Sequence, residues 1–486
     1  MVERPSTTVS AVTEARTVAA DVLADLRAGA LLDPSFERRG AVLDARDRRW
    51  TQELLYGMLR RRAWLDALLS ERVRGGLARL DADLTDLLRL GVYQLLYMRS
   101  VPAYAAIAQT VELAKRRHGI GASKLANAVL RRVDRERQER GDEALALPPA
   151  LALNGQPATP PTDGAPAAAS RQTGGGPARP DPIDTLALTY SHPRWLVARW
   201  VARWGAEDTA RLLDANNAEA PLIVRPYNVV REQLEAMLES AGVHVDEAPL
   251  ARDSLQLRSG VTMTELGAFR QGLFFVQDPA STLVTQYAAV PADAEVADLC
   301  AAPGGKTLEL ARSARAVYTA DRSFARLQRV IANARRLEAR NVHALVADAR
   351  EPAVRPVDAV LVDVPCTGTG TFRRHPDARW RLKISDLAVM AALQRAIIRA
   401  AARVVKPGGL LIYSTCSLEP EENDAQIESF LAEHRDFTLE PPPDGAVPES
   451  VVDAGRLRVL PQRHGTDGAF AARLRRAPDL AEPPTA

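Results

Sequence analysis

Three cysteines are the residues of this 486-residue chain whose placement points most directly to chemistry. Cys366 follows an apolar run in the segment DVPCTGTG, and Cys416 follows another in the segment YSTCS. Catalytic groups usually sit where strands end, whereas a buried thiol inside a strand acts as a small hydrophobic residue. Cys300 lies in a glycine-rich turn and is expected to be a packing residue. No secretory signal is visible, so a disulfide framework is not expected.

A pair of thiols suits one methyl transfer, the methylation of cytosine at C5. That carbon is a poor nucleophile, but addition of a thiolate to C6 makes it enamine-like, so that it can attack the methyl group of S-adenosylmethionine. The adduct must then lose its C5 proton and expel the thiolate. Two thiols allow a division of labour in which one adds to the ring and the other assists release.

The segment DLCAAPGGKT, residues 298–307, predicts a ligand-binding turn. We expect a buried strand over Ala294–Leu299 before it and a helix over Leu308–Ala316 after it. Glycine in such a turn lets the backbone approach a ligand closely. The spacing is neither that of a dinucleotide fingerprint nor that of a P-loop, so a tight turn in some other enzyme is the alternative.

Aspartates end three further predicted strands. The strands and their acids are Ala316–Ala320 with Asp321, Ala344–Ala347 with Asp348, and Asp358–Val362 with Asp363. An acid at the end of the second strand of a doubly wound sheet is placed to accept hydrogen bonds from a ribose. Each aspartate taken alone is more often a helix N-cap. Three in succession after the glycine turn favour a ligand with a ribose and an amine, and S-adenosylmethionine has both.

The segments DLCAAPGGKT, LVDVPCTGTGTFRRHPDARW and YSTCSLEPEEND resemble the signature of RNA 5-methylcytosine methyltransferases of the NOL1/NOP2/Sun type, over roughly residues 185–475. The resemblance implies that Cys416 attacks the base and that Cys366 aids product release, whereas DNA cytosine methyltransferases attack with the Pro-Cys thiol. It also implies that Asp363 contacts the target cytosine. It assigns S-adenosyl-L-methionine binding to Cys300, Ala301, Ala302, Pro303, Gly304, Gly305, Lys306, Asp321, Asp348 and Asp363.

Residues 8–140 predict an all-helical domain, because their apolar residues recur at helical spacing. The segments LRLGVYQLLYM and KLANAVLRR resemble the NusB-like RNA-binding domain, which few of these methyltransferases carry. The combination is similar to the bacterial branch that acts on 16S small-subunit ribosomal RNA, and it implies a cytosine of the position-967 type as target. Residues 1–140 contain 25 Lys and Arg against 18 Asp and Glu, which indicates either an RNA partner or a solvated helical surface.

The predicted fold class is therefore multidomain. The all-α NusB-like domain is followed by residues 141–183, a linker rich in Ala, Pro and Gly that cannot bury a core and is expected to be disordered. Residues 184–265 predict a small α+β RNA-recognition-like subdomain, and residues 266–476 predict a Rossmann-like α/β methyltransferase domain.

Several charged residues have two interpretations on sequence alone. Arg225 and Asn228 of the small subdomain are either RNA contacts or ordinary surface residues. Arg373 and Arg374, which follow the Cys366 loop, either hold RNA phosphates beside the base or clamp a loop, and the phosphate interpretation is favoured. The glutamates after Cys416 are expected to cap the next helix; they are Glu419, Glu421 and Glu422.

The pattern also excludes some classes. No run of eighteen apolar residues is present, so no membrane span is expected. The first ten residues lack the apolar core of a signal peptide, and we expect a cytoplasmic monomer. None of the seven histidines is spaced as a metal ligand pair, so no metal is expected.

Two alternatives remain at this point. The first is a methyltransferase with the same chemistry that acts on tRNA, and the helical N-terminal block argues against it. The second is a non-catalytic RNA-binding factor for ribosome assembly. The presence of Cys366, Cys416, Asp363 and Lys306 together argues against the second.

Overall fold

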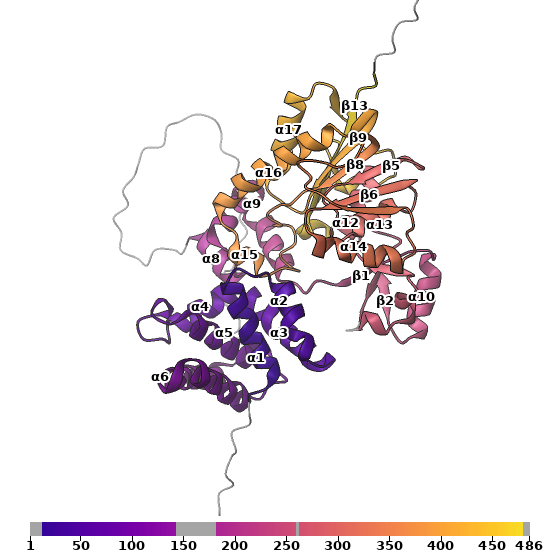
Figure 1. The fold of residues 1–486 in the computed structure, drawn as a ribbon. Coiled ribbons are helices and arrows are strands. Elements are labelled where there is room, and N and C mark those ends of the chain that lie inside the picture. The colour runs from indigo at the N-terminus through magenta and orange to yellow at the C-terminus, as the bar shows by residue number, and fades with distance from the viewer. Residues whose placement is uncertain (1–11, 142–180, 259–261, 480–486) are drawn as a thin grey trace, which may run out of the picture. The chain divides into compact units, whose positions relative to one another are not determined.

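The computed structural model describes residues 12–141, 181–258 and 262–479, and these form two compact units divided after Leu213 (Figure 1). The predicted linker, residues 141–183, lies almost wholly outside the described residues. Within the described ranges, no helix combines the length and apolar character needed to cross a membrane.

The first unit is helical, as the spacing of its apolar residues predicted. Its elements are α1 (Glu14–Arg27), α2 (Leu32–Arg39), η1 (Gly40–Val42), α3 (Ala45–Arg60), α4 (Arg62–Ser70), η2 (Leu77–Arg79), α5 (Ala82–Tyr97), α6 (Ala103–Arg140) and α8 (Pro182–Thr189), and α9 (Arg194–Asn217) begins here. Asp81 caps α5 by accepting a hydrogen bond from Asp83 N at 2.8 Å. Most of α5 is buried, which makes it the central helix of this unit.

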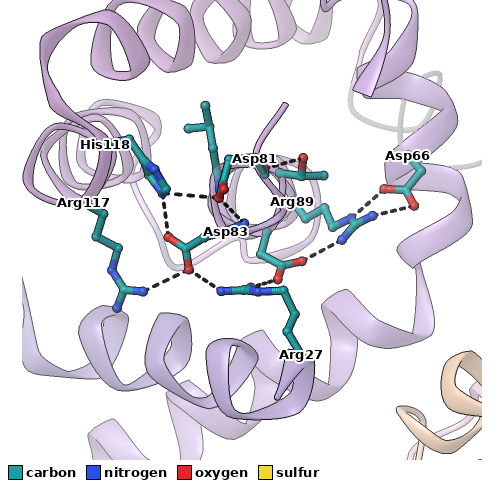
Figure 2. Close-up of polar contacts among 10 residues, drawn as sticks. Arg27, Asp66, Asp81, Asp83, Arg89, Arg117 and His118 are labelled. Carbon is teal, nitrogen blue, oxygen red and sulfur yellow. Dashed lines mark hydrogen bonds and ion pairs between the residues drawn. The ribbon is translucent and has the colours of Figure 1, made fainter. Parts of the chain in front are cut away.

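Ion pairs hold the helices of this unit together (Figure 2). Asp83 on α5 accepts from Arg117 at 3.1 Å and from His118 at 2.8 Å, both on α6, and from Arg27 on α1. Burial alone would raise the pKa of Asp83, but the hydrogen bond from His118 and the two guanidinium charges lower it overall. Part of the arginine excess, for which an RNA partner and a solvated helical surface were the two interpretations, therefore forms ion pairs inside the helical unit.

The second unit begins with a small four-stranded sheet. Its elements are β1 (Leu222–Pro226), α10 (Arg231–Ser240), β2 (Val245–Glu247), β3 (Leu255–Leu257), η3 (Met263–Glu265), α11 (Gly267–Arg270) and β4 (Phe274–Val276). The strand order is β2-β3-β1-β4, and every neighbouring pair is antiparallel. The sheet packs on α10 and α11 through a core that includes Val224, Leu234, Leu255 and Phe274.

The larger sheet has nine strands in the order β11-β12-β13-β9-β8-β5-β6-β7, with β10 paired to β13. The strands are β5 (Glu295–Asp298), β6 (Ala316–Asp321), β7 (Val342–Val346), β8 (Val357–Asp363), β9 (Val405–Thr415), β10 (Phe437–Leu439), β11 (Val452–Asp453), β12 (Arg456–Val459) and β13 (Ala469–Arg476). Strands β5 to β9 are parallel, and β13 is antiparallel to β9. The chain order reverses between β5 and β8, which is where ligands bind in sheets of this kind.

Helices cover both faces of this sheet (Figure 1). They are α12 (Pro279–Ala288), α13 (Gly305–Leu310), α14 (Phe324–Arg336), α15 (Ala378–Arg381), α16 (Ile384–Ala402), η4 (Pro420–Glu422), α17 (Asp424–Glu433), η5 (Glu449–Val451) and α18 (Pro461–His464). Successive residues of β9 alternate between two cores: Ile412 belongs to the core that includes Leu283 of α12, and Leu411 belongs to the core that includes Ile398 of α16 and Ile427 of α17. Burial on both faces explains the continuous apolar runs that marked these strands in the sequence.

The predicted strands are present with small shifts of their ends, but one helix prediction is wrong in extent. The helix expected over Leu308–Ala316 is α13, which begins earlier, at Gly305, and ends at Leu310. Ala316 already belongs to β6. The apolar residues between them, Ala311 and Ala314, are buried in a turn, so their spacing reflected burial and not helix.

Candidate active site

The glycine turn joins β5 to α13 as the sequence predicted. Gly304 has φ 108°, a conformation that side chains disfavour, and a Cβ there would lie 3.0 Å from Cγ1 of Val330 on α14. A Cβ at Gly305 would lie 2.9 Å from Nε2 of Gln277. A larger residue at Gly304 would therefore be strained in its backbone and crowded by α14, whereas one at Gly305 would displace the end of the Gln277 side chain.

The predicted carboxylates lie along one edge of the sheet, because β8, β5, β6 and β7 are parallel neighbours. Asp321 is the last residue of β6, is 5% exposed, and accepts a hydrogen bond from Ser323 N at 2.8 Å. Asp363 is the last residue of β8. Asp348 comes two residues after β7 and pairs with Arg350 at 2.6 Å, which lowers the pKa of its carboxyl to about 2.

A fourth acid, Asp298 at the end of β5, was part of the predicted turn but was given no role. Its side chain is 1% exposed, and its Oδ2 accepts a hydrogen bond from Thr307 Oγ1 at 2.6 Å. Its Oδ1 is buried with no hydrogen-bond partner in the described structure. Burial raises the pKa of Asp298 to about 7.

Lys306, the first cation after the turn, points back across the sheet edge. Its Nζ donates to Oδ2 of Asp363 at 2.7 Å, and Ser414 Oγ donates to the other oxygen of Asp363 at 2.8 Å. Burial works against the charge of Lys306, but the attraction of Asp363 outweighs it and raises the pKa of the ammonium. Negative charge on Cys416 adds to that attraction, so the sulfur lies within the field of the ammonium.

The two thiols predicted to react lie side by side. Strands β8 and β9 are parallel neighbours with Asp363 opposite Ser414, so the loops that follow them leave the sheet together. The Sγ atoms of Cys366 and Cys416 are 3.2 Å apart, and both residues are half-buried free cysteines. The hydrogen bond with Cys416, together with burial, raises the pKa of the Cys366 thiol well above its ordinary value.

Close backbone contacts hold the two loops together. Gly370 N donates to the carbonyl of Cys416 at 2.9 Å, and Gly468 N donates to the carbonyl of Gly370 at 2.7 Å. A Cβ at Gly370 would lie 2.7 Å from that Cys416 oxygen and 2.8 Å from Cα of Gly468. The position of Cys416 therefore depends on the absence of a side chain at Gly370.

Three sets of relatives bear on this arrangement. A model of the 16S rRNA methyltransferase RsmB/F family matches residues 286–475, a NusB family model matches residues 13–135, and a ferredoxin-like domain of the RsmF/B-like methyltransferases matches residues 192–264. The probable ribosomal RNA small subunit methyltransferase B of Synechocystis sp. is 34% identical over 89% of this chain and 92% of its own length. The chain belongs to this methyltransferase B family.

Further relatives agree with this assignment. The probable ribosomal RNA small subunit methyltransferase B of Bacillus subtilis is 32% identical over 87% of this chain and 89% of its own length. The crystal structure of the protein PH0851 superposes with a TM-score of 0.72 at 26% identity and covers 97% of this chain and 99% of its own. The fold class expected from the sequence is confirmed: a NusB domain, a ferredoxin-like subdomain and a methyltransferase domain with a mixed sheet.

The four charged or polar residues considered for RNA contact bind partners within the protein. Arg225 is 4% exposed and binds Glu309 at 2.8 Å, and Asn228 donates to the carbonyl of Leu337 at 2.9 Å. Both therefore tie the small sheet to the catalytic domain. The paired arginines 373 and 374 also have internal partners, described next.

Arg373 and Arg374 form a buried cluster with Asp278 and Asp467. Both guanidiniums donate to Oδ2 of Asp278 at 2.7 Å, and both also donate to Asp467. The structure thus favours the loop-clamp interpretation over the phosphate interpretation. The clamp fixes the end of the Cys366 loop against the start of α12 and the turn before β13.

The sequence interpretation missed the role of Glu422. It was expected to cap the helix after Cys416, but α17 begins after Asn423 and Glu422 points inward, with no exposed surface. Its carboxylate accepts hydrogen bonds from Thr367 and Ser417, the residues that follow the two cysteines. The only local signal was an acid placed six residues after Cys416, which does not distinguish a cap from a buried tie.

Proposed function

We propose that this protein transfers the methyl group of S-adenosylmethionine to C5 of a cytosine in 16S small-subunit ribosomal RNA. The observation that carries the proposal is the 3.2 Å separation of Cys366 Sγ and Cys416 Sγ at the ligand edge of a methyltransferase sheet. The names of the matched relatives support ribosomal RNA as the substrate. The resemblance to the family implies a cytosine of the position-967 type, which is the proposed target.

The residues at the sheet edge fit the proposed cofactor. Asp321 ends the second strand of the parallel order, where an acid accepts hydrogen bonds from a ribose. The turn over residues 300–306 supplies a glycine cradle, and a buried carboxylate oxygen of Asp298 beside it lacks a partner in the described structure. Asp348 and Asp363 complete the acidic edge that would face the sulfonium and the amine. When bound, the cofactor supplies the electrophilic methyl group.

In the proposed reaction, the Cys416 thiolate forms a bond to C6 of a cytosine that has left its base stack. The ring electrons move to C5, which would take the methyl group and leave S-adenosylhomocysteine. Transfer of the C5 proton to solvent then restores the C5–C6 double bond and expels the Cys416 thiolate. Negative charge on Cys416 is one of the interactions that raise the pKa of Lys306, while Cys366, whose raised pKa keeps the proton on its thiol, assists the release. Asp363 holds Lys306 and is placed to contact the base.

We also propose a division of labour along the chain. Residues 8–140 and 184–265 would hold the RNA, with an affinity that falls as salt rises, and residues 266–476 would carry the chemistry. Because the proposed substrate is ribosomal RNA, the protein is expected to act in the cytoplasm.

The test uses the purified full chain, S-adenosylmethionine and a 16S ribosomal RNA transcript, with tRNA as a parallel substrate. Bisulfite sequencing should find one new 5-methylcytosine in the ribosomal transcript. Cys416→Ala should abolish it, because no thiolate reaches C6. Cys366→Ala should accumulate a protein–RNA adduct that survives denaturant, because release is slowed.

Two results would contradict this scheme. Adduct formation by the Cys416 variant and not by the Cys366 variant would exchange the two roles. Methylation of the tRNA but not of the ribosomal transcript would show that the substrate is tRNA, while the proposed chemistry would be unchanged.

A further inference from the structure

We propose that Glu422 is a positioning residue whose buried carboxylate ties the Cys366 loop to the Cys416 loop and keeps the two sulfurs within reach of one cytosine ring. The inference rests on the function proposed above, because it concerns the same pair of thiols. It adds a residue that contacts neither the cofactor nor the base in the proposed mechanism.

The tie reaches both loops, with two hydrogen bonds from the Cys366 loop and one from the Cys416 loop. Oε1 of Glu422 accepts from the backbone N of Thr367 at 2.9 Å, and Oε2 accepts from the hydroxyls of Thr367 and Ser417. Thr367 directly follows Cys366, and Ser417 directly follows Cys416. One carboxylate therefore fixes the residue next to each sulfur, across 55 residues of sequence on one side and five on the other.

A third element supports the same carboxylate. Gln394 on α16 donates from Nε2 to Oε1 of Glu422 at 2.9 Å and to the carbonyl of Pro365 at 2.9 Å. The backbone of Glu422 is held as well, since Tyr413 OH donates to its carbonyl at 2.6 Å. The carboxylate is thus held from α16 and from both loops, and the backbone of Glu422 is held from β9.

The charge of Glu422 has a second consequence. The side chain has no exposed surface, and no ion pair to it is found among the described residues. Burying a carboxylate without a cation is costly even with several donors, and neutral side chains can tie loops at lower cost. Its charge adds to the hydrogen bond with Cys416 and to burial in keeping the proton on Cys366. Lys306 interacts with charge on Cys416, so the two sulfurs have different charged neighbours.

The experiment separates position from charge with two substitutions. Glu422→Ala removes every tie. Glu422→Gln removes the charge but keeps a tie, because an amide can donate to the hydroxyls of Thr367 and Ser417, which accept as well as donate. The matched control is Glu428→Ala, a glutamate on α17 whose side chain is 68% exposed.

Two readouts are taken on the full chain. The first is the rate at which diamide, which removes the two thiol hydrogens, forms a Cys366–Cys416 disulfide, followed by peptide mass spectrometry. The second is kcat and KM for the ribosomal transcript. Glu422→Ala should slow disulfide formation at least about 10-fold and lower kcat about 100-fold with little change in KM, as expected when reacting groups are displaced.

Glu422→Gln should form the disulfide within about 3-fold of the unchanged chain, since the tie persists. Its Cys366 should be alkylated by iodoacetamide at lower pH, since the neighbouring charge is gone. A purely structural glutamate would not shift that pH profile. If Glu422→Ala does not fold, the double variant Thr367→Val with Ser417→Ala, which removes both hydroxyl donors to Oε2, takes its place with the same expectations.

The proposal is overturned if Glu422→Ala, or the double variant, cross-links and turns over as fast as Glu428→Ala. If the unsubstituted protein forms the disulfide at the expected rate but methylates no cytosine, the proposed function is contradicted, while the proposed role of Glu422 in positioning the sulfurs is not. The two failures are therefore distinguishable.

Discussion

Asp278 is the residue whose substitution best tests the clamp around Arg373 and Arg374. Its Oδ2 accepts from both guanidiniums at 2.7 Å, and its Oδ1 accepts from Ala280 N at 2.9 Å, which caps α12. Asp278→Asn keeps the cap through the remaining carbonyl oxygen. It replaces Oδ2 with an NH₂ group, which turns two acceptor contacts into donor–donor contacts and leaves the cluster with one excess positive charge.

The burial of the cluster sets the expected magnitude. The side chains of Asp278, Asp467 and Arg373 are 7%, 8% and 7% exposed, and that of Arg374 is 25% exposed. Removing one partner of a buried ion pair costs about 3–5 kcal/mol, because the remaining charge is left without compensation. Water reaches Arg374 in part, so we expect a loss of local stability near the lower end, about 3 kcal/mol.

Hydrogen exchange followed by mass spectrometry measures this locally in the full chain. Peptides that cover residues 371–377 and 465–468 should exchange faster in Asp278→Asn by a factor on the order of 100, the equivalent of about 3 kcal/mol. The control is Asp453→Asn, which removes a carboxylate that is 66% exposed and 3.1 Å from Arg458, and its effect should stay below about 1 kcal/mol.

Equal protection of these peptides in the two variants would refute the clamp. The salt dependence of RNA affinity distinguishes the clamp from a phosphate-binding role of Arg374. Arg374→Met should leave the salt dependence of RNA affinity unchanged, whereas a lost phosphate contact would reduce the slope by about one.

Two further predictions concern the sheet edge. Burial raises the pKa of Asp298 from 3.8 to about 7, so the folded protein keeps this proton to higher pH than the unfolded chain does. Each pKa unit corresponds to about 1.4 kcal/mol. The free energy of unfolding should therefore fall by about 4 kcal/mol as the pH rises from 4 to 8. Asp298→Asn should flatten the dependence of Tm on pH over that range, and parallel curves would contradict the assignment. Gly370→Ala should slow both methylation and diamide cross-linking, because its Cβ would lie 2.7 Å from the Cys416 carbonyl. The control is Gly267→Ala, whose Cβ would meet no atom closer than 3.7 Å, and it should change neither the methylation rate nor the cross-linking rate. Equal rates in the two variants would contradict the role of Gly370.

The sequence by itself determined the elements and the order in which they occur. Helices of the first unit repeat apolar residues with the helical period, and the central parallel strands β5 and β8 are buried on both faces, so each signal is complete within a short segment. The same holds for the glycine turn and for the acids that end the strands. Cys366 and Cys416 were each placed directly after a strand by their local context alone.

Only the tertiary structure decided which groups meet. The sulfurs of Cys366 and Cys416 come to 3.2 Å across 50 residues, and Arg373 reaches Asp467 across 94 residues. Glu422 turns inward because two loops offer it hydroxyl donors, and Arg225 is buried because it pairs with Glu309. Such partners depend on strand register and on helix packing between distant segments. Local periodicity contains no record of either, so a charged residue in the sequence does not reveal whether its partner is RNA, water or the protein itself.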